Sequence, residues 1–127
     1  MAVSSPSLPD LTALTRSLVK IRAVVPEDAF TASVLGTQRN GNGIVIGDDG
    51  LILTIGYLIT EATDVWLTTY SGQELPGHGL AYDQVTGFGL VLPLGSLGDS
   101  HLELGQSSEL ALDCEAWVPV IRSSRRR

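Results

Sequence analysis

The sequence predicts an all-β fold, a small barrel or sandwich of short antiparallel strands. Fourteen glycines and six prolines are spread along its 127 residues, and this composition favours many short elements joined by tight turns. About seven short runs that are apolar or alternate in polarity recur at a spacing of roughly 8–12 residues, as is typical of small β-barrels and sandwiches. The length suits one domain with its own core rather than two.

The overall charge and hydropathy exclude several classes of partner. The net charge is −6, whereas a surface that binds nucleic acid is basic, so we expect no nucleic-acid partner. No apolar run approaches the ~20 residues of a membrane-spanning helix, so we expect no membrane span. The first residues lack the basic start and long apolar core of a signal peptide. We therefore expect a cytoplasmic chain, or a periplasmic or secreted one if a leader was removed.

The N-terminal part predicts a flexible leader and a short helix. Residues 1–8 form the leader, and Ser7–Asp10 combines the hydroxyl, the proline and the acid of a helix start. The leucines of Leu11–Leu18 then lie on one helical face, so we expect this helix to pack on the barrel. The domain with its leading helix is expected over residues 9–121, and a basic tail over 122–127.

The expected strands follow the helix in order. A glycine-rich turn at Arg39–Gly43 is expected to lead into a β-hairpin, which the cluster Gly47–Gly50 reverses because its glycines allow φ > 0. The strands themselves are expected at Val19–Val25, Phe30–Gln38, Ile44–Ile46, Leu51–Leu53, Val65–Tyr70, Glu74–Tyr82, Phe88–Leu92 and Ala116–Ile121.

No residue pattern indicates metal or cofactor chemistry. His78 and His101 have no histidine or cysteine nearby at a metal-ligand spacing, and no carboxylate pair stands out as an acid and base. The single cysteine, Cys114, excludes an internal disulfide and lies in an apolar run, which favours a half-buried structural thiol. We expect no cofactor and no bound metal.

One stretch shows where a side chain is positioned. The strand pattern that reaches Leu53 breaks at Thr54–Tyr57, which predicts a tight helical turn at the end of a strand. From Gly41 to this turn the chain resembles the trypsin-like serine proteases of the HtrA/Deg type. That family has a glycine-small-glycine turn, an apolar strand, an acidic-glycine turn and an Ile-Leu-Thr strand that leads into the catalytic histidine.

The resemblance continues over most of the chain, through Trp66–Thr68, Gly72–Gly77, Tyr82–Leu92, Leu94–Ser100 and Glu109–Leu112. It implies a single antiparallel six-stranded trypsin-like β-barrel, the N-terminal half of the family's two-barrel fold. It also implies that the chemistry is lost. The position that matches the histidine is Tyr57, and a phenol is a poor base at neutral pH. The position that matches the aspartate is Gly87, and the serine would belong to a second barrel.

We therefore expect no catalytic residue in this chain, and a catalytically incompetent half or pseudoprotease that binds protein or peptide. Thr54, Tyr57 and Phe88 are its candidate groove-lining residues. The ring of Tyr57 either fills the former cleft or lines a peptide groove. The expected partners are a polypeptide, a second barrel, or another copy of the chain, because each barrel of the family covers an apolar flank of the other.

Two other interpretations remain open. In the first, the chain is a fragment of an active serine endopeptidase whose second barrel supplies the serine and whose base lies elsewhere. In the second, it is a small unrelated β-barrel whose similarity to the family is accidental.

Overall fold

The computed structural model describes residues 11–98, 101–102, 104–106, 108, 110–113 and 116. For residues 11–13 only the backbone is described. The elements, in chain order, are α1 (Leu11–Arg16), β1 (Leu18–Val24), α2 (Ala32–Leu35), β2 (Gln38–Val45), β3 (Ile52–Ile55), the 3-10 turn η1 (Gly56–Leu58), β4 (Asp64–Thr69), β5 (Glu74–Tyr82) and β6 (Phe88–Pro93).

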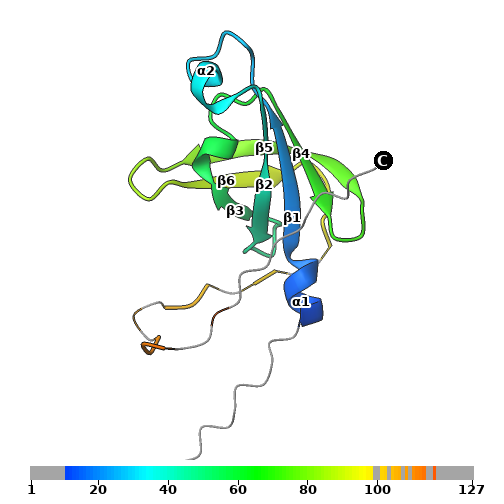
Figure 1. Ribbon diagram of the computed structural model, residues 1–127. Helices are drawn as coiled ribbons and strands as arrows, with labels where there is room; N and C mark the ends of the chain where they lie inside the picture. The colour runs from blue at the N-terminus through cyan, green and yellow to red at the C-terminus, as the bar shows by residue number, and fades with distance from the viewer. Residues whose placement is uncertain are drawn as a thin grey trace, which may run out of the picture.

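The six strands form a closed antiparallel barrel in the order β1-β2-β3-β6-β5-β4. β1 closes the ring because it pairs on one side with β2 and on the other with β4: Ile21 faces Gly41 and Leu67. Figure 1 shows α1 at one end of the barrel and α2 at the other. The predicted six-stranded barrel with a short N-terminal helix is confirmed.

The barrel interior is filled by aliphatic side chains from alternate strand positions. Ile21, Ile52, Leu67 and Val91 are fully buried there, and burying each such side chain contributes roughly 1.5–3 kcal/mol. Their alternation with exposed residues along β1 and β4 is the period-2 pattern from which the strands were predicted.

The strand predicted at Phe30–Gln38 is wrong. This segment is a loop that contains α2, and β2 begins only at Gln38. The carboxylate of Glu61 accepts hydrogen bonds of 2.8 Å from the N–H groups of Phe30 and Thr31. A contact across 30 residues thus overrides the local preference of a β-branched sequence for strand.

The turn predicted at Arg39–Gly43 is also wrong, because these residues lie within β2. Their glycines are explained by packing rather than by reversal of the chain. A Cβ on Gly43 would lie 2.5 Å from Cγ2 of Ile52 and 2.9 Å from Cδ1 of Ile21. The interior of a barrel this small leaves no room for a side chain at that position.

The hairpin that follows is confirmed. Ile44 pairs with Leu53, and Val45 with Ile52. Of the two glycines in its turn, Gly50 adopts the expected positive φ of 89°.

Other predictions lie partly or wholly outside the described residues. The helix is described from Leu11, and Leu18 belongs to β1 rather than to the helix. The leader, the helix start at Ser7–Asp10, Cys114 and the basic tail fall outside the described residues, as does the strand predicted at Ala116–Ile121 except for its first residue.

Candidate functional site

The candidate site is the corner where β3 ends and η1 begins. The N–H of Gly56 donates a 2.7 Å hydrogen bond to the carbonyl of Gly87, and Ile55 pairs with Phe88 in the last step of the β3–β6 ladder. Tyr57 and Gly87, which the resemblance assigns to the catalytic histidine and aspartate, therefore belong to backbone segments that are directly bonded to each other.

A tyrosine that the sequence did not single out covers this corner. A Cβ on Gly56 would overlap Cδ2 and Cε2 of the Tyr82 ring, so the absence of a side chain at Gly56 lets that ring pack on the backbone. Tyr82 pairs with Gly89 at the end of the β5–β6 hairpin. The sequence offered one signal for this packing: Tyr82 ends one predicted strand and Phe88 begins the next.

The two positions matched to the catalytic pair offer no acid and base. The ring of Tyr57 is 40% exposed. Gly87 has a φ of +80°, and a Cβ built on it would meet nothing within 4 Å. An aspartate would have space there, but it would have to adopt the left-handed conformation, which costs a non-glycine residue roughly 1–2 kcal/mol.

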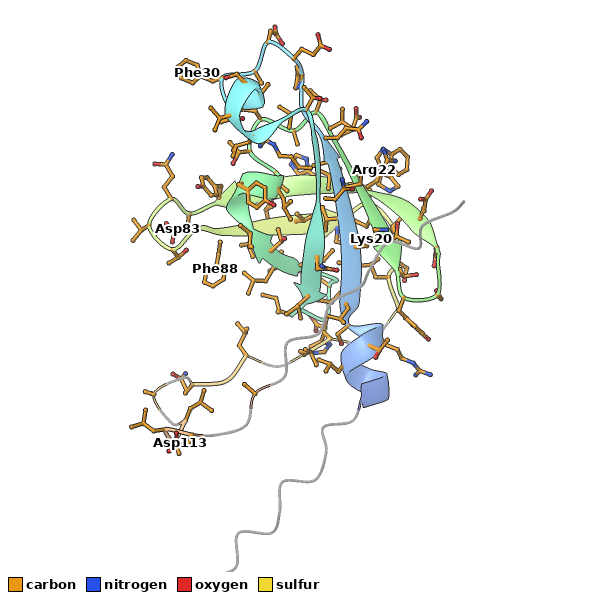
Figure 2. The ribbon with its side chains drawn as sticks, in the orientation of Figure 1. Lys20, Arg22, Phe30, Asp83, Phe88 and Asp113 are labelled. Atoms are coloured by element: carbon orange, nitrogen blue, oxygen red, sulfur yellow. The ribbon has the colours of Figure 1, made fainter. Side chains whose placement is uncertain are left out.

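Thr54 and Phe88 have different roles at the corner. Thr54 is buried, and its Oγ1 donates a 2.8 Å hydrogen bond to the carbonyl of Asn42. This bond joins β2 to β3 just beyond the two residue pairs of their ladder. The ring of Phe88 is half exposed and lies on the outside of the barrel (Figure 2).

Three shallow hollows form one continuous surface here, which we call the outer groove. Their volumes are about 280, 380 and 200 Å³. The first two share Tyr82, and the last two share Leu53 and Phe88. Thr54 lines the third hollow, and Tyr57 lines none of the three. The most exposed large apolar side chains of the outer groove are 43–57% exposed: Ile55, Leu80, Tyr82 and Phe88.

A buried arginine holds the corner in place. Arg39 is only 2% exposed. Its Nη1 donates to the carbonyls of Tyr57 (2.7 Å) and Thr60 (2.9 Å), its Nη2 to Oγ1 of Thr31 (2.6 Å), and its Nε to the carbonyl of Gly36 (3.3 Å). The guanidinium thus ties η1 to the α2 loop, and each bond to a charged donor is stronger than a neutral one.

Glu61 completes this network from the other side. It has a positive φ of 61°, which is uncommon for a residue with a side chain, and its carboxylate binds the backbone of the α2 loop. Hydrogen bonding from the Thr31 side chain, then from the N–H groups of Phe30 and Thr31, lowers the pKa of Glu61, with a smaller contribution from the charge of Arg39.

The lowered pKa predicts how the loop responds to acid. The folded-state pKa lies below that of the unfolded chain, so the contribution of Glu61 to stability is complete above the ordinary glutamate value. It is lost as the pH falls through the lower, folded value. We expect the amide NMR shifts of Phe30 and Thr31 to titrate with a midpoint below the ordinary glutamate pKa. Glu61→Gln should abolish this titration, and Glu27→Gln, in the same loop, should leave it intact. An inflection at or above the ordinary value would contradict the assignment.

Comparison with known proteins identifies the fold. No protein-family model and no curated protein matches the sequence. The HtrA-type protease AlgW with a tripeptide superimposes with a TM-score of 0.65 at 12% identity, over 80% of this chain and 30% of that one. The fold is that of an HtrA-type protease barrel. An AlgW variant with a tripeptide gives 0.66 with the same identity and coverage. A serine endoprotease from Yersinia pestis gives 0.53 at 17% identity, over 65% of this chain and 27% of that one.

These similarities confirm the trypsin-like fold that the resemblance implied. The chain spans about 30% of the length of AlgW.

Among the described residues, no group of three or more His, Cys, Asp and Glu side chains could hold a metal ion. No helix in this part of the chain is long and apolar enough to cross a membrane. His78 and His101 are exposed.

Proposed function

We propose that this chain is a catalytically incompetent HtrA-type barrel that binds protein or peptide. The observation that carries the proposal is the outer groove. It presents four large apolar side chains to solvent beside a corner with a phenol and a glycine at the positions matched to the acid and base. Apolar patches of several hundred Å² on a soluble protein mark interaction sites.

Three kinds of polypeptide suit such a surface. One is an extended segment of another protein, the second is a further barrel, and the third is a second copy of this chain. All three would remove the exposed rings of Tyr82 and Phe88 from water. Aromatic side chains of this kind supply much of the binding energy at protein interfaces.

A second candidate function is that of a piece of an active serine endopeptidase. It is favoured by the coverage of AlgW, of which this chain spans about 30%. The gene sequence after Arg127 distinguishes the two candidates. A continuation with Gly-Asp-Ser-Gly-Gly favours the endopeptidase, and one without the serine favours the binding module. A fluorophosphonate probe should not label the chain, and labelling would overturn the proposal of incompetence.

Tyr57→Ala tests whether the corner contributes to binding. Truncating this half-exposed ring should lower the free energy of unfolding by less than about 1 kcal/mol. Tyr57 lies between Ile55 and Ile59, which line the third and the first hollow. The substitution should weaken the binding of a peptide that also covers the corner by about fivefold, the loss expected for an interface aromatic worth roughly 1 kcal/mol. Urea unfolding and calorimetric titration measure the two effects. Tyr70→Ala, which truncates a ring with similar exposure in the β4–β5 turn, should leave the affinity unchanged. If the free energy of peptide binding falls by no more than the free energy of unfolding does, Tyr57 only fills space.

A further inference from the structure

We infer that the outer groove binds an extended polypeptide segment in which a lysine or arginine stands next to apolar side chains. This inference rests on the proposed binding function and names the class of ligand. Three features carry it: the shape of the outer groove, its charges, and the position of those charges among the aromatic rings.

The shape of the outer groove fits a chain rather than a compact small molecule. The hollows of about 380 and 200 Å³ are neighbours, because Leu53 and Phe88 line both. Side chains two residues apart on an extended segment are separated by roughly 6.6–6.8 Å. Two apolar side chains at such a spacing would each enter one hollow and contact the ring of Phe88, which lines both.

The charges of the outer groove are of one sign. Its lining residues include two acids, Glu61 and Asp83, and no lysine, arginine or histidine. Figure 2 shows Asp83 and Phe88 on one side of the barrel, and Lys20 and Arg22 on another. The carboxylate of Glu61 already binds the backbone of the α2 loop, so Asp83 is the acid that a ligand would meet. A basic ligand is also favoured by the net charge of −6.

The carboxylate of Asp83 is held by two hydrogen bonds within its own loop and can bind the lysine or arginine of the ligand. Its Oδ1 accepts from the N–H of Val85 and its Oδ2 from Oγ1 of Thr86, both at 3.0 Å. Each oxygen has a further lone pair for a donor from the ligand, and the side chain is exposed. Tyr82 and Phe88 line the same hollow, and the faces of aromatic rings attract cations. The apolar side chain of the ligand therefore enters the middle hollow, and the basic residue next to it reaches Asp83 at the edge of that hollow.

The experiment titrates the full 127-residue chain, labelled with ¹⁵N, with three capped octapeptides. The first is Ser-Gly-Val-Ser-Ile-Arg-Ser-Gly. The second replaces Arg with Glu, and the third replaces Val and Ile with Ser. We expect the first peptide to shift the amides of Leu53, Tyr82 and Phe88. Asp83→Asn should weaken its binding about three- to fivefold at low salt, the range of an exposed ion pair. This difference should disappear in 1 M salt.

The controls separate the inference from the proposed function. Asp64→Asn removes an exposed acid at the start of β4, outside the outer groove, and should not change the affinity. The Glu peptide should bind more weakly than the Arg peptide to the unaltered protein, which tests the charge preference without altering the fold. Equal binding of the Arg and Glu peptides, or no effect of Asp83→Asn, would overturn the inference and leave the binding function standing. No groove shift with any peptide at millimolar concentration, or shifts confined to β1 and β4, would overturn both.

Discussion

Replacing Arg39 with alanine should lower the free energy of unfolding by about 3–5 kcal/mol, because several buried hydrogen bonds from a charged donor, each worth about 1.5–3 kcal/mol, are lost together. The guanidinium is nearly fully buried and donates to the carbonyls of Tyr57 and Thr60 and to Oγ1 of Thr31. Without it, these acceptors remain shielded from water and lose their donor. Urea unfolding, with the midpoint and the slope fitted separately, measures the loss.

The matched control for Arg39 is Arg22→Ala. Arg22 is an exposed arginine on β1, and the same substitution there should change stability by no more than about 0.5 kcal/mol. Arg39→Lys should recover only part of the loss, because one ammonium cannot reach acceptors that lie in several directions. A loss below about 1 kcal/mol for Arg39→Ala would show that the α2 loop and η1 stay joined without the guanidinium.

Adding one methyl group to the barrel interior should also destabilise the fold. At Gly43 the new Cβ would lie 2.5 Å from Cγ2 of Ile52, and overpacking of this kind costs about 1–3 kcal/mol. A Gly→Ala change also stabilises a protein by roughly 0.4–1 kcal/mol, because it lowers the conformational entropy of the unfolded chain. The steric cost is larger than this gain, so the variant should be less stable than the unaltered protein. Gly105→Ala, where a Cβ would meet nothing within 4 Å, should be neutral or slightly stabilising.

A double-mutant cycle assigns the Gly43 effect to its cause. Ile52→Ala alone should cost about 2–5 kcal/mol, because it leaves a cavity in the core. In the double variant the methyl at position 43 partly fills that cavity. The double variant should therefore be more stable than the two single losses predict, by more than about 0.5 kcal/mol. Additive losses would mean that the new methyl does not reach Ile52.

The sequence predicted the parts of the fold that local residues determine. The β4–β5 and β5–β6 hairpins agree with the strands predicted at Val65–Tyr70, Glu74–Tyr82 and Phe88–Leu92, because the short segments between these strands carry the glycine and polar residues of turns. The bounds of β5, Glu74–Tyr82, agree with the prediction at both ends. The α2 loop was assigned to a strand because its anchor, Glu61, lies 30 residues away from Thr31, and no local pattern reveals such a bond.

The same division applies to the candidate site. The break in strand pattern after Leu53 located the corner to within two residues, since β3 ends at Ile55. The Gly56–Gly87 hydrogen bond joins the two segments that the resemblance placed together. Arg39 was not singled out because an arginine beside glycines and asparagines predicts a solvated turn. Only the closed barrel reveals that its guanidinium is buried against the carbonyls of η1.

The closure of the barrel by β1 has a consequence for how the chain folds. β1 is the first strand to be synthesised, yet one of its partners is β4, with Val19 opposite Thr69. The β2–β3, β4–β5 and β5–β6 hairpins need only nearby residues, and hairpins form in roughly 1–10 μs. Pairing β1 with β4 and β3 with β6 requires long loops to close first, which slows folding. Until β6 has left the ribosome, β3 keeps an open edge that can pair with another nascent chain, so aggregation should be most acute during synthesis.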